Sequence, residues 1–152
     1  TQSYGVSIPH LMTPTWCTIT AYDLNKGIIK WQKPLGQDLL AAKEGGKNTG
    51  EPRGSQRNGM IVPSTGLVFS TAKDGKIYCF DEDTGNVLWT GELPTGTEGL
   101  PSIYETNGRH YIVGNASTTL TWGPKSRESG IGAQGEQPEG AYVVFGLPEK
   151  KE

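Results

Sequence analysis

Short runs in which hydrophobic and polar residues alternate are the main pattern of this chain. Two of the clearest are residues 18–22 and 76–80, where successive side chains point to opposite faces. A period of two residues is typical of a β-strand in a sheet. Gly, Asn and Asp residues separate the runs, and no segment shows the period of 3.6 residues that marks a helix. We therefore predict an all-β chain without a helix.

One longer pattern occurs twice, at an offset of 58 residues. Both copies place an Asp, a Gly and a Trp at the same spacing, namely Asp23, Gly27 and Trp31 and then Asp81, Gly85 and Trp89. The Asp can accept backbone N–H groups and start a turn, and the Gly can adopt a positive φ, so each copy predicts a hairpin. A large indole at one fixed place in each unit suits a wedge between adjacent sheets. A repeat of this length indicates stacked supersecondary units.

The segments between and after the two copies predict further strands. Residues 58–90 contain four strands in a meander, residues 100–113 form a hairpin, and residues 140–147 form a final strand. A four-stranded meander is one blade of a β-propeller. The chain then divides into the end of one blade (1–36), a loop (37–57), one full blade (58–95), part of a further blade with the final strand (96–148), and a tail (149–152).

Composition limits what these blades can do alone. Only 34% of the 152 residues are hydrophobic, while 22 are Gly and 10 are Pro. About two blades with unpaired edges bury little core, so we expect the segment to be marginally stable or to associate with itself. The net charge of −2 argues against nucleic acid as a partner. No apolar run reaches the roughly 20 residues of a membrane span. No signal peptide is present, and Thr1 in place of Met suggests a removed leader or upstream region.

Few residues have the spacing of a reactive or metal-binding site. Cys79 lies within a predicted strand and is expected in the core, and a disulfide with Cys17 is left open by the sequence. His10 and His110 lack the spacing of metal ligands. The aspartates of the repeat are turn residues, so no catalytic residue and no metal ligand is predicted.

Several segments, taken in order, resemble the C-terminal part of the PQQ-dependent quinoprotein dehydrogenases, and above all the membrane-bound glucose dehydrogenase type. They are 14–24, 66–69, 80–89, 92–96, 101–113 and 140–148. The resemblance implies an eight-bladed β-propeller built from tryptophan-docking repeats, with PQQ and calcium near its axis. Such enzymes oxidise alcohols or aldose sugars and pass electrons to a quinone or a cytochrome. The resemblance also implies a periplasmic or exported protein whose remaining blades are partners of this segment, with residues 140–147 closing the ring against the first blade.

The resemblance also suggests where the cofactor would be contacted. The base and the main calcium ligands of the family belong to blades upstream, so this segment alone should be inactive. Arg57 and Asn58 lie where the family often has an apolar residue and Gly-Gly, and Arg57 could bind a PQQ carboxylate. Trp122 follows the place of a Gly-rich loop that approaches the cofactor. The alternatives are a solvated Arg57 and a Trp122 that packs under its own loop, while Trp16 more naturally packs a loop.

The sequence leaves two questions open. The polar, Gly-rich stretches 37–57 and 125–139 either cover the cofactor face or lack order. The alternative function is a non-catalytic propeller that binds protein partners, as in the outer-membrane assembly lipoprotein with the same repeats. Residues 14–16 and the ending 140–148 favour the enzyme, whereas the departures from the family pattern favour the alternative, and they are Arg57, Asn58, Ser117 and Thr118.

Overall fold

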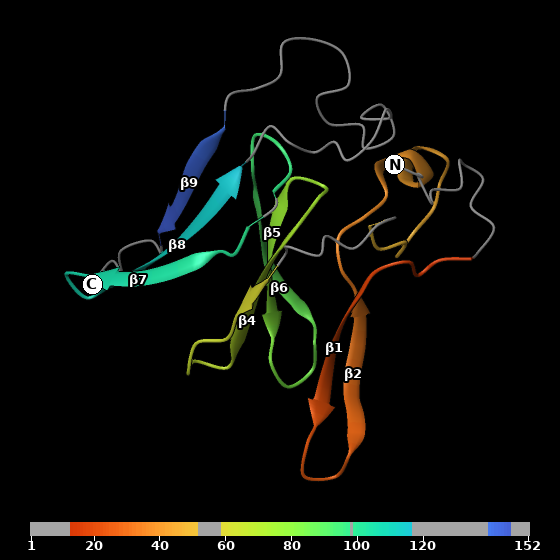
Figure 1. The fold of residues 1–152 in the computed structure, drawn as a ribbon, viewed down its shortest axis with the longest axis horizontal. Coiled ribbons are helices and arrows are strands. Elements are labelled where there is room, and N and C mark those ends of the chain that lie inside the picture. Colours follow the sequence, from red (N-terminus) through yellow and green to blue (C-terminus); the bar gives the residue numbers. More distant parts are fainter. Residues whose placement is uncertain (1–12, 52–58, 98, 117–139, 147–152) are drawn as a thin grey trace, which may run out of the picture.

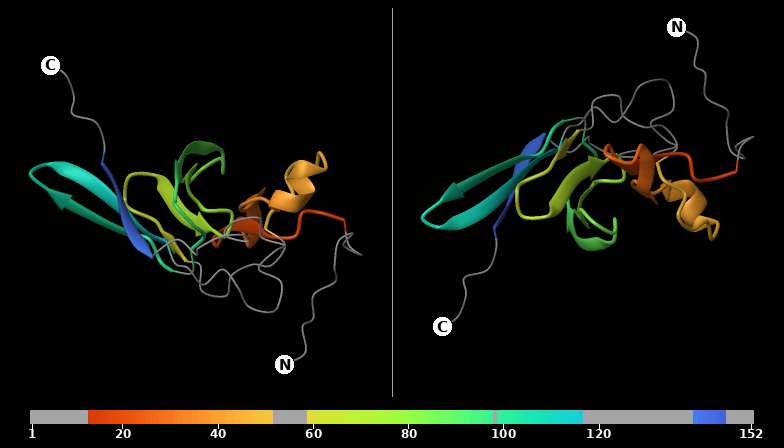
Figure 2. Two further views of the ribbon diagram at one scale, coloured as in Figure 1. Left: turned by 90° about the horizontal axis from the view of Figure 1, so that it is seen from above. Right: turned by 90° about the horizontal axis from the view of Figure 1, so that it is seen from below.

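Three antiparallel sheets follow one another along the chain (Figure 1). The computed structural model describes residues 13–51, 59–97, 99–116 and 140–146. Within these ranges every element except one short helix is a strand, which confirms the all-β class and a partial propeller. Seen from above and below, the sheets stand in chain order as a row of blades (Figure 2). No helix among the described residues is long and apolar enough to cross a membrane.

The first sheet is a hairpin of β1 (Thr18–Asp23) and β2 (Ile28–Pro34). The expected turn chemistry joins them, because the Asp23 carboxylate accepts the backbone N–H groups of Asn25 and Lys26 at 3.0 and 3.1 Å. Gly27 has φ +66°, a conformation that a side chain disfavours. The predicted hairpin is therefore confirmed in its local detail.

The second sheet has four strands in the order of the sequence. They are β3 (Met60–Ile61), β4 (Leu67–Ala72), β5 (Lys76–Asp81) and β6 (Val87–Glu92). The turn from β5 to β6 repeats the chemistry of the first hairpin: the Asp81 carboxylate accepts the Thr84 N–H at 2.7 Å, and Gly85 has φ +68°. β3 has only two residues, so the first strand of this sheet, at one of its edges, is shorter than the sequence pattern suggests.

The third sheet has three strands, β7 (Ser102–Thr106), β8 (Arg109–Ala116) and β9 (Ala141–Gly146). β9 pairs with β8 over its full length, from Ala116 opposite Ala141 to Tyr111 opposite Gly146. Its direction relative to β7 and β8 matches that of β5 relative to β3 and β4. The third sheet thus has the first three strands of a blade. The closure of a ring by β9 stays a prediction.

A short helix, α1 (Leu39–Lys43), interrupts the segment predicted as a loop. The expectation of a chain without a helix is therefore wrong. The Asp38 carboxylate caps the helix by accepting the N–H of Ala41 at 3.1 Å. The helix ends at Lys43, and two residues later Gly45 has φ +89° and donates its N–H to the Ala42 carbonyl at 3.0 Å. Five residues are too few to show a helical period.

The core lies between the first two sheets. Its buried members come from β1, β4 and β5 and from the residue that follows β2, and they are Ile19, Leu35, Val68, Ala72 and Phe80. Phe80 is 0% exposed, and Tyr78 lies half-buried on the same face of β5. Cys79 is also buried, which confirms its expected core position, but it projects from the opposite face because strand side chains alternate.

This alternation settles the question of the disulfide. Cys17 packs against the core of the first two sheets, whereas Cys79 is on the far side of β5. Both cysteines are free thiols. A disulfide would require one of them to pass through the sheet.

The sheets have two different ends. Tight turns join β1 to β2, β3 to β4, β5 to β6 and β7 to β8 at one end. At the other end, which we call the connection end, lie the segment after β2, the turn from β4 to β5, the segment from β6 to β7, the end of β8 and the start of β9 (Figure 1). In propellers of this strand order these segments lie on one face of the ring, and binding residues concentrate on such loops.

Candidate functional site

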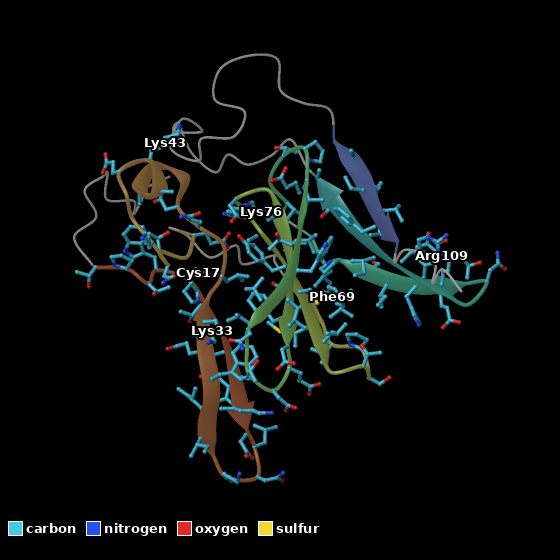
Figure 3. All side chains as sticks on the ribbon, turned by 180° about the vertical axis from the view of Figure 1, so that it is seen from behind. Cys17, Lys33, Lys43, Phe69, Lys76 and Arg109 are labelled. Carbon is cyan, nitrogen blue, oxygen red and sulfur yellow. The ribbon has the colours of Figure 1, made fainter. Side chains whose placement is uncertain are left out.

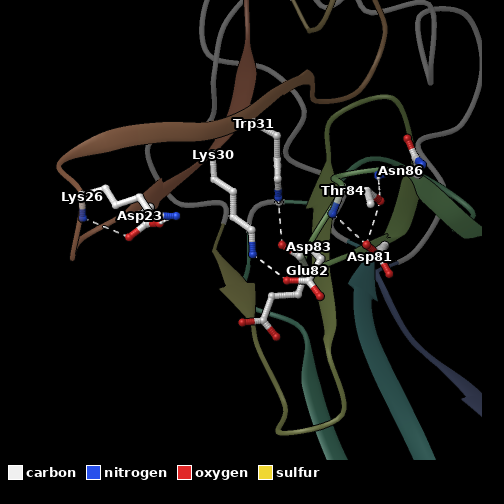
Figure 4. Close-up of polar contacts among 9 residues, drawn as sticks. All are labelled: Asp23, Lys26, Lys30, Trp31, Asp81, Glu82, Asp83, Thr84 and Asn86. Carbon is white, nitrogen blue, oxygen red and sulfur yellow. Dashed lines mark hydrogen bonds and ion pairs between the residues drawn. The ribbon is translucent and has the colours of Figure 1, made fainter.

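The contact between the first two sheets is made by Trp31 (Figure 4). Its indole N–H donates a hydrogen bond of 2.8 Å to the carbonyl of Glu82, in the turn between β5 and β6. A Cβ at Gly85 would lie 2.6 Å from the indole ring, so only a glycine leaves room for it. The Trp of one repeat therefore docks on the Asp-x-x-x-Gly turn of the next. The predicted wedge between sheets is confirmed for Trp31.

Charged side chains surround the contact between Trp31 and the turn from β5 to β6. The ammonium of Lys30 donates a hydrogen bond of 2.6 Å to the carboxylate of Asp83, and this bond raises the pKa of Lys30. Asp81 accepts the hydroxyl and the N–H of Thr84, both at 2.7 Å, and these bonds lower the pKa of its carboxyl. An exposed pair such as Lys30–Asp83 contributes little stability, so the indole and the core hold the sheets together.

We expect acid to weaken this turn. A folded-state pKa below the unfolded one means that the native protein binds fewer protons, so stability is present above the unfolded pKa and falls as the pH drops through the folded pKa. For Asp81 this window lies below its ordinary value of 3.8. Urea unfolding between pH 2 and 6 should show a steeper acid loss in the wild type than in Thr84→Val. Identical slopes would contradict the role of Thr84.

Trp89 makes a different contact with the third sheet. Its ring meets that of Phe145 edge to face, with ring centroids 5.1 Å apart, and Gly91 lies under both rings. Phe145 is the second-last residue of β9, and Phe80 is the second-last residue of β5, so the two aromatic residues occupy equivalent places in their sheets. The indole of Trp89 nevertheless remains 39% exposed. Trp31 packs against the core cluster that contains Phe80, so the surroundings of the two repeated tryptophans correspond in part.

The turn of the first sheet has the same Asp-x-x-x-Gly form as the turn that Trp31 contacts. In the described part of the chain no side chain packs against it at Gly27. A Cβ at Gly27 meets no atom within 4 Å, although the equivalent position at Gly85 is filled by Trp31. Tyr22, which occupies the place of Phe80, is 63% exposed, and Leu24 is 91% exposed. An apolar strand face of this kind fits a preceding blade.

A cluster of buried acids and a phenol lies at the connection end, between the first two sheets. Glu51 is 1% exposed, and its carboxylate accepts the backbone N–H of Lys73 at 2.6 Å. The Tyr78 hydroxyl donates to Asp74 at 2.5 Å, while the other carboxylate oxygen of Asp74 is buried without a partner among the described residues. The cluster joins the segment after β2 to the turn between β4 and β5.

Burial suppresses ionisation in this cluster. It raises the pKa of the Asp74 carboxyl, with the hydrogen bond from Tyr78 opposing it, and it raises the pKa of the Tyr78 phenol. Burial, with the charge of Glu51 second, raises the pKa of the Cys17 thiol to about 11. A thiolate is therefore disfavoured at neutral pH, and Cys17 is unsuited to nucleophilic chemistry. The cluster therefore holds the segment after β2 against the turn between β4 and β5.

A second polar network joins the second and third sheets at the connection end. The Thr71 hydroxyl donates to the Gly99 carbonyl at 3.0 Å, and the Thr97 hydroxyl donates to the Asn115 side chain at 2.6 Å. A Cβ at Gly99 would lie 2.5 Å from that same side chain. Asn115 is the second-last residue of β8, so this network holds the end of that strand in place.

The residues predicted to contact a cofactor lie outside the described residues. They are Arg57, Asn58 and Trp122, and their roles stay predictions. Within the described ranges no group of three or more His, Cys, Asp and Glu side chains could hold a metal ion. Glu51 and Asp74 are buried acids, and they offer no positive charge to the carboxylates of PQQ. The described residues therefore do not by themselves fit a PQQ site, and we derive no chemical step from them.

Sequence patterns alone did not identify the buried cluster. Asp74 is visible in the sequence as the Asp of an Asp-Gly turn, and Glu51 as one charge in a polar loop. Burial of both depends on the segment after β2 returning to the first two sheets. The N–H of Trp16 donates to the Thr49 carbonyl at 2.8 Å, and the N–H of Glu51 donates to the Leu35 carbonyl at 2.9 Å. These contacts join residues that are far apart in the sequence, so no local sequence pattern predicts them.

Strand meanders with an indole docked on the turn of the next sheet define part of a β-propeller. Comparison with known proteins agrees: the family "Glucose/ethanol/alcohol dehydrogenase, beta-propeller domain" matches residues 4–112. The chain belongs to the PQQ-dependent quinoprotein dehydrogenase family.

Individual relatives are much longer than this chain. It is 39% identical over 105 residues to the glycerol dehydrogenase large subunit of Gluconobacter thailandicus, covering 66% of the chain and 14% of the relative. It is 29% identical over 136 residues to the quinoprotein glucose dehydrogenase of Escherichia coli (strain K12), covering 80% of the chain and 17% of the relative. The fold resembles a quinohemoprotein alcohol dehydrogenase of Pseudomonas putida HK5, with a TM-score of 0.56 at 20% identity over 84% of this chain and 16% of that one.

Proposed function

We propose that this chain is the C-terminal segment of a PQQ-dependent dehydrogenase that oxidises a sugar or an alcohol. The observation that carries the proposal is the family match over residues 4–112, on a fold whose sheets dock as successive blades. Electrons would pass to a quinone or a cytochrome, and the protein would be periplasmic or otherwise exported. PQQ and calcium would be held mainly by blades outside this chain.

Within that protein the segment would complete the ring of blades. It would also hold the segments of the connection end in position. The polar contacts of Glu51 and of Asn115 hold the chain just before residues 52–58 and the end of β8 before residues 117–139. These are the segments that carry Arg57, Asn58 and Trp122 in the sequence. No described residue acts as a base in this proposal.

The segment alone is expected to have no dehydrogenase activity. The test is dye reduction with an aldose or a primary alcohol in the presence of PQQ and calcium. We expect none from the 152-residue chain and clear turnover from the complete protein. Turnover by the chain alone would refute the proposal that the base and the metal ligands lie in blades outside this chain. A complete protein that binds no PQQ in a titration would instead favour a non-catalytic propeller that binds protein partners.

A further inference from the structure

A buried carboxylate with one unpartnered oxygen lies in the turn between β4 and β5. Asp74 is only 7% exposed. One of its carboxylate oxygens accepts the Tyr78 hydroxyl at 2.5 Å, whereas Oδ1 is buried without a hydrogen-bond partner among the described residues. Most buried polar atoms in folded proteins have a partner, and a buried charge without one costs free energy. The fold therefore supports the charged form of Asp74 only in part.

Opposing influences act on the ionisation of Asp74. Burial is the largest of them, and it raises the pKa of the carboxyl above its ordinary value of 3.8. The hydrogen bond from Tyr78 favours the charged form, and so, to a smaller extent, do the charge of Lys76 at the start of β5 (Figure 3) and the backbone N–H groups of Lys76 and Gln37. The sum of these effects favours the neutral carboxyl at a pH where an exposed aspartate is already ionised.

The other titratable groups around this turn belong to the segments that it joins. Glu51, in the segment after β2, is 1% exposed and accepts the backbone N–H of Lys73 at 2.6 Å. Burial raises the pKa of the Tyr78 phenol, and the charges of Asp74 and Glu51 raise it further. Burial also raises the pKa of the Cys17 thiol to about 11, with the charge of Glu51 adding to the effect and that of Lys73 opposing it. Ionisation of Asp74 thus adds a negative charge to a poorly hydrated cluster that already holds Glu51.

We propose that Asp74 is a pH-dependent switch of the connection end. Neutral Asp74 keeps the turn between β4 and β5 packed against the segment after β2, and its ionisation as the pH rises loosens that contact. Because the pKa of Asp74 is higher in the folded chain than in the unfolded one, the folded state binds more protons. The stability that this provides is present below the unfolded pKa and is lost as the pH rises through the folded pKa.

The position of the switch in the chain gives it a consequence for function. Residues 52–58 follow Glu51 directly, so a looser contact acts on the chain just before Arg57 and Asn58, which are predicted to contact the cofactor. The proposal itself does not depend on dehydrogenase activity, so either can fail without the other.

NMR titration of the carboxyl carbons in the 152-residue chain tests the ionisation of Asp74 directly. We expect its midpoint above 3.8 and that of Asp81, whose pKa is lowered by its bonds to Thr84, below 3.8. Tyr78→Phe removes the hydrogen bond that favours the charged form, and it should move the Asp74 midpoint further up. A wild-type midpoint for Asp74 at or below 3.8 would overturn the proposal.

Hydrogen exchange at two backbone amides tests the loosening. The Lys73 N–H donates to Glu51 at the proposed switch, whereas the Thr84 N–H donates to Asp81 in the turn between β5 and β6. Between pH 4 and pH 7 the protection of the Lys73 amide in the wild type should fall by about threefold or more relative to Asp74→Asn, which cannot ionise. The protection of the Thr84 amide should keep the same ratio between the two proteins.

The comparison is made across pH, so a constant cost of the Asn amide in the variant does not affect it. Equal changes at the two amides would mean that Asp74 acts on the whole fold and not on this contact, and would overturn the switch. If circular dichroism shows the chain alone to be unfolded, the same measurements on the complete protein give the same decision.

Discussion

Replacing Phe80 by Ala should lower the free energy of unfolding by about 3–5 kcal/mol, the usual cost of removing a buried phenylalanine. Phe80 is 0% exposed and lies in the core between the first two sheets, with Ile19 and Leu35 of the first sheet and its continuation opposite. The loss combines the burial of the ring with the cavity that it leaves. Urea denaturation of the purified chain, followed by tryptophan fluorescence, measures it.

The repeat supplies a matched control for this experiment. Tyr22 occupies the same place in the first copy but is 63% exposed. Tyr22→Ala should therefore change the free energy of unfolding by no more than about 0.5 kcal/mol, as for other surface substitutions. Equal losses for the two variants would mean that burial between the sheets does not distinguish them.

The second large effect is expected from Gly85→Ala. The new methyl group would lie 2.6 Å from the indole of Trp31, and the residue would have to keep φ +68°. The left-handed conformation costs about 1–2 kcal/mol and the crowding about 1–3 kcal/mol, so we expect a loss of about 2–5 kcal/mol in total. The same urea experiment measures the loss, and a red shift of the Trp31 emission would report the displaced indole.

Gly27→Ala separates the two causes. Gly27 has φ +66° but faces open space, so its substitution should cost only the conformational part, about 1–2 kcal/mol. A double-mutant cycle with Trp31→Ala provides a further check, since the extra cost at Gly85 should disappear when the indole is absent. An unchanged cost in the Trp31→Ala background would show that the indole is not docked on Gly85.

Local chemistry explains what could be predicted from the sequence. The Asp and Gly of each repeat act within five residues of one another, so the turns at Asp23 and Asp81 were predictable together with the strands around them. The repeat also predicted that an indole would join adjacent sheets, which Trp31 confirms. The helix at Leu39–Lys43 escaped prediction because a single turn of helix is capped by Asp38 but has no measurable period.

The contacts of the connection end could not be predicted in the same way. Asp74 and Glu51 are 23 residues apart in sequence, and each is polar in a segment rich in turn residues. Their burial requires the segment after β2 to pack on Cys17 and Lys73, which are themselves distant in the sequence. A hollow beside Lys33 likewise exists only because β2 and the turn before β6 meet.

Alternation, turn residues and an ordered set of segments that span the chain were enough to predict the strands, the turns and the family. Which copy of each repeated residue is buried depends instead on how the sheets pack. Trp31 and Phe80 lie between two sheets, whereas Tyr22 and much of Trp89 remain exposed. The physical reason is that a strand residue is buried only when another sheet packs against its face, and a repeat offset does not say which faces are covered.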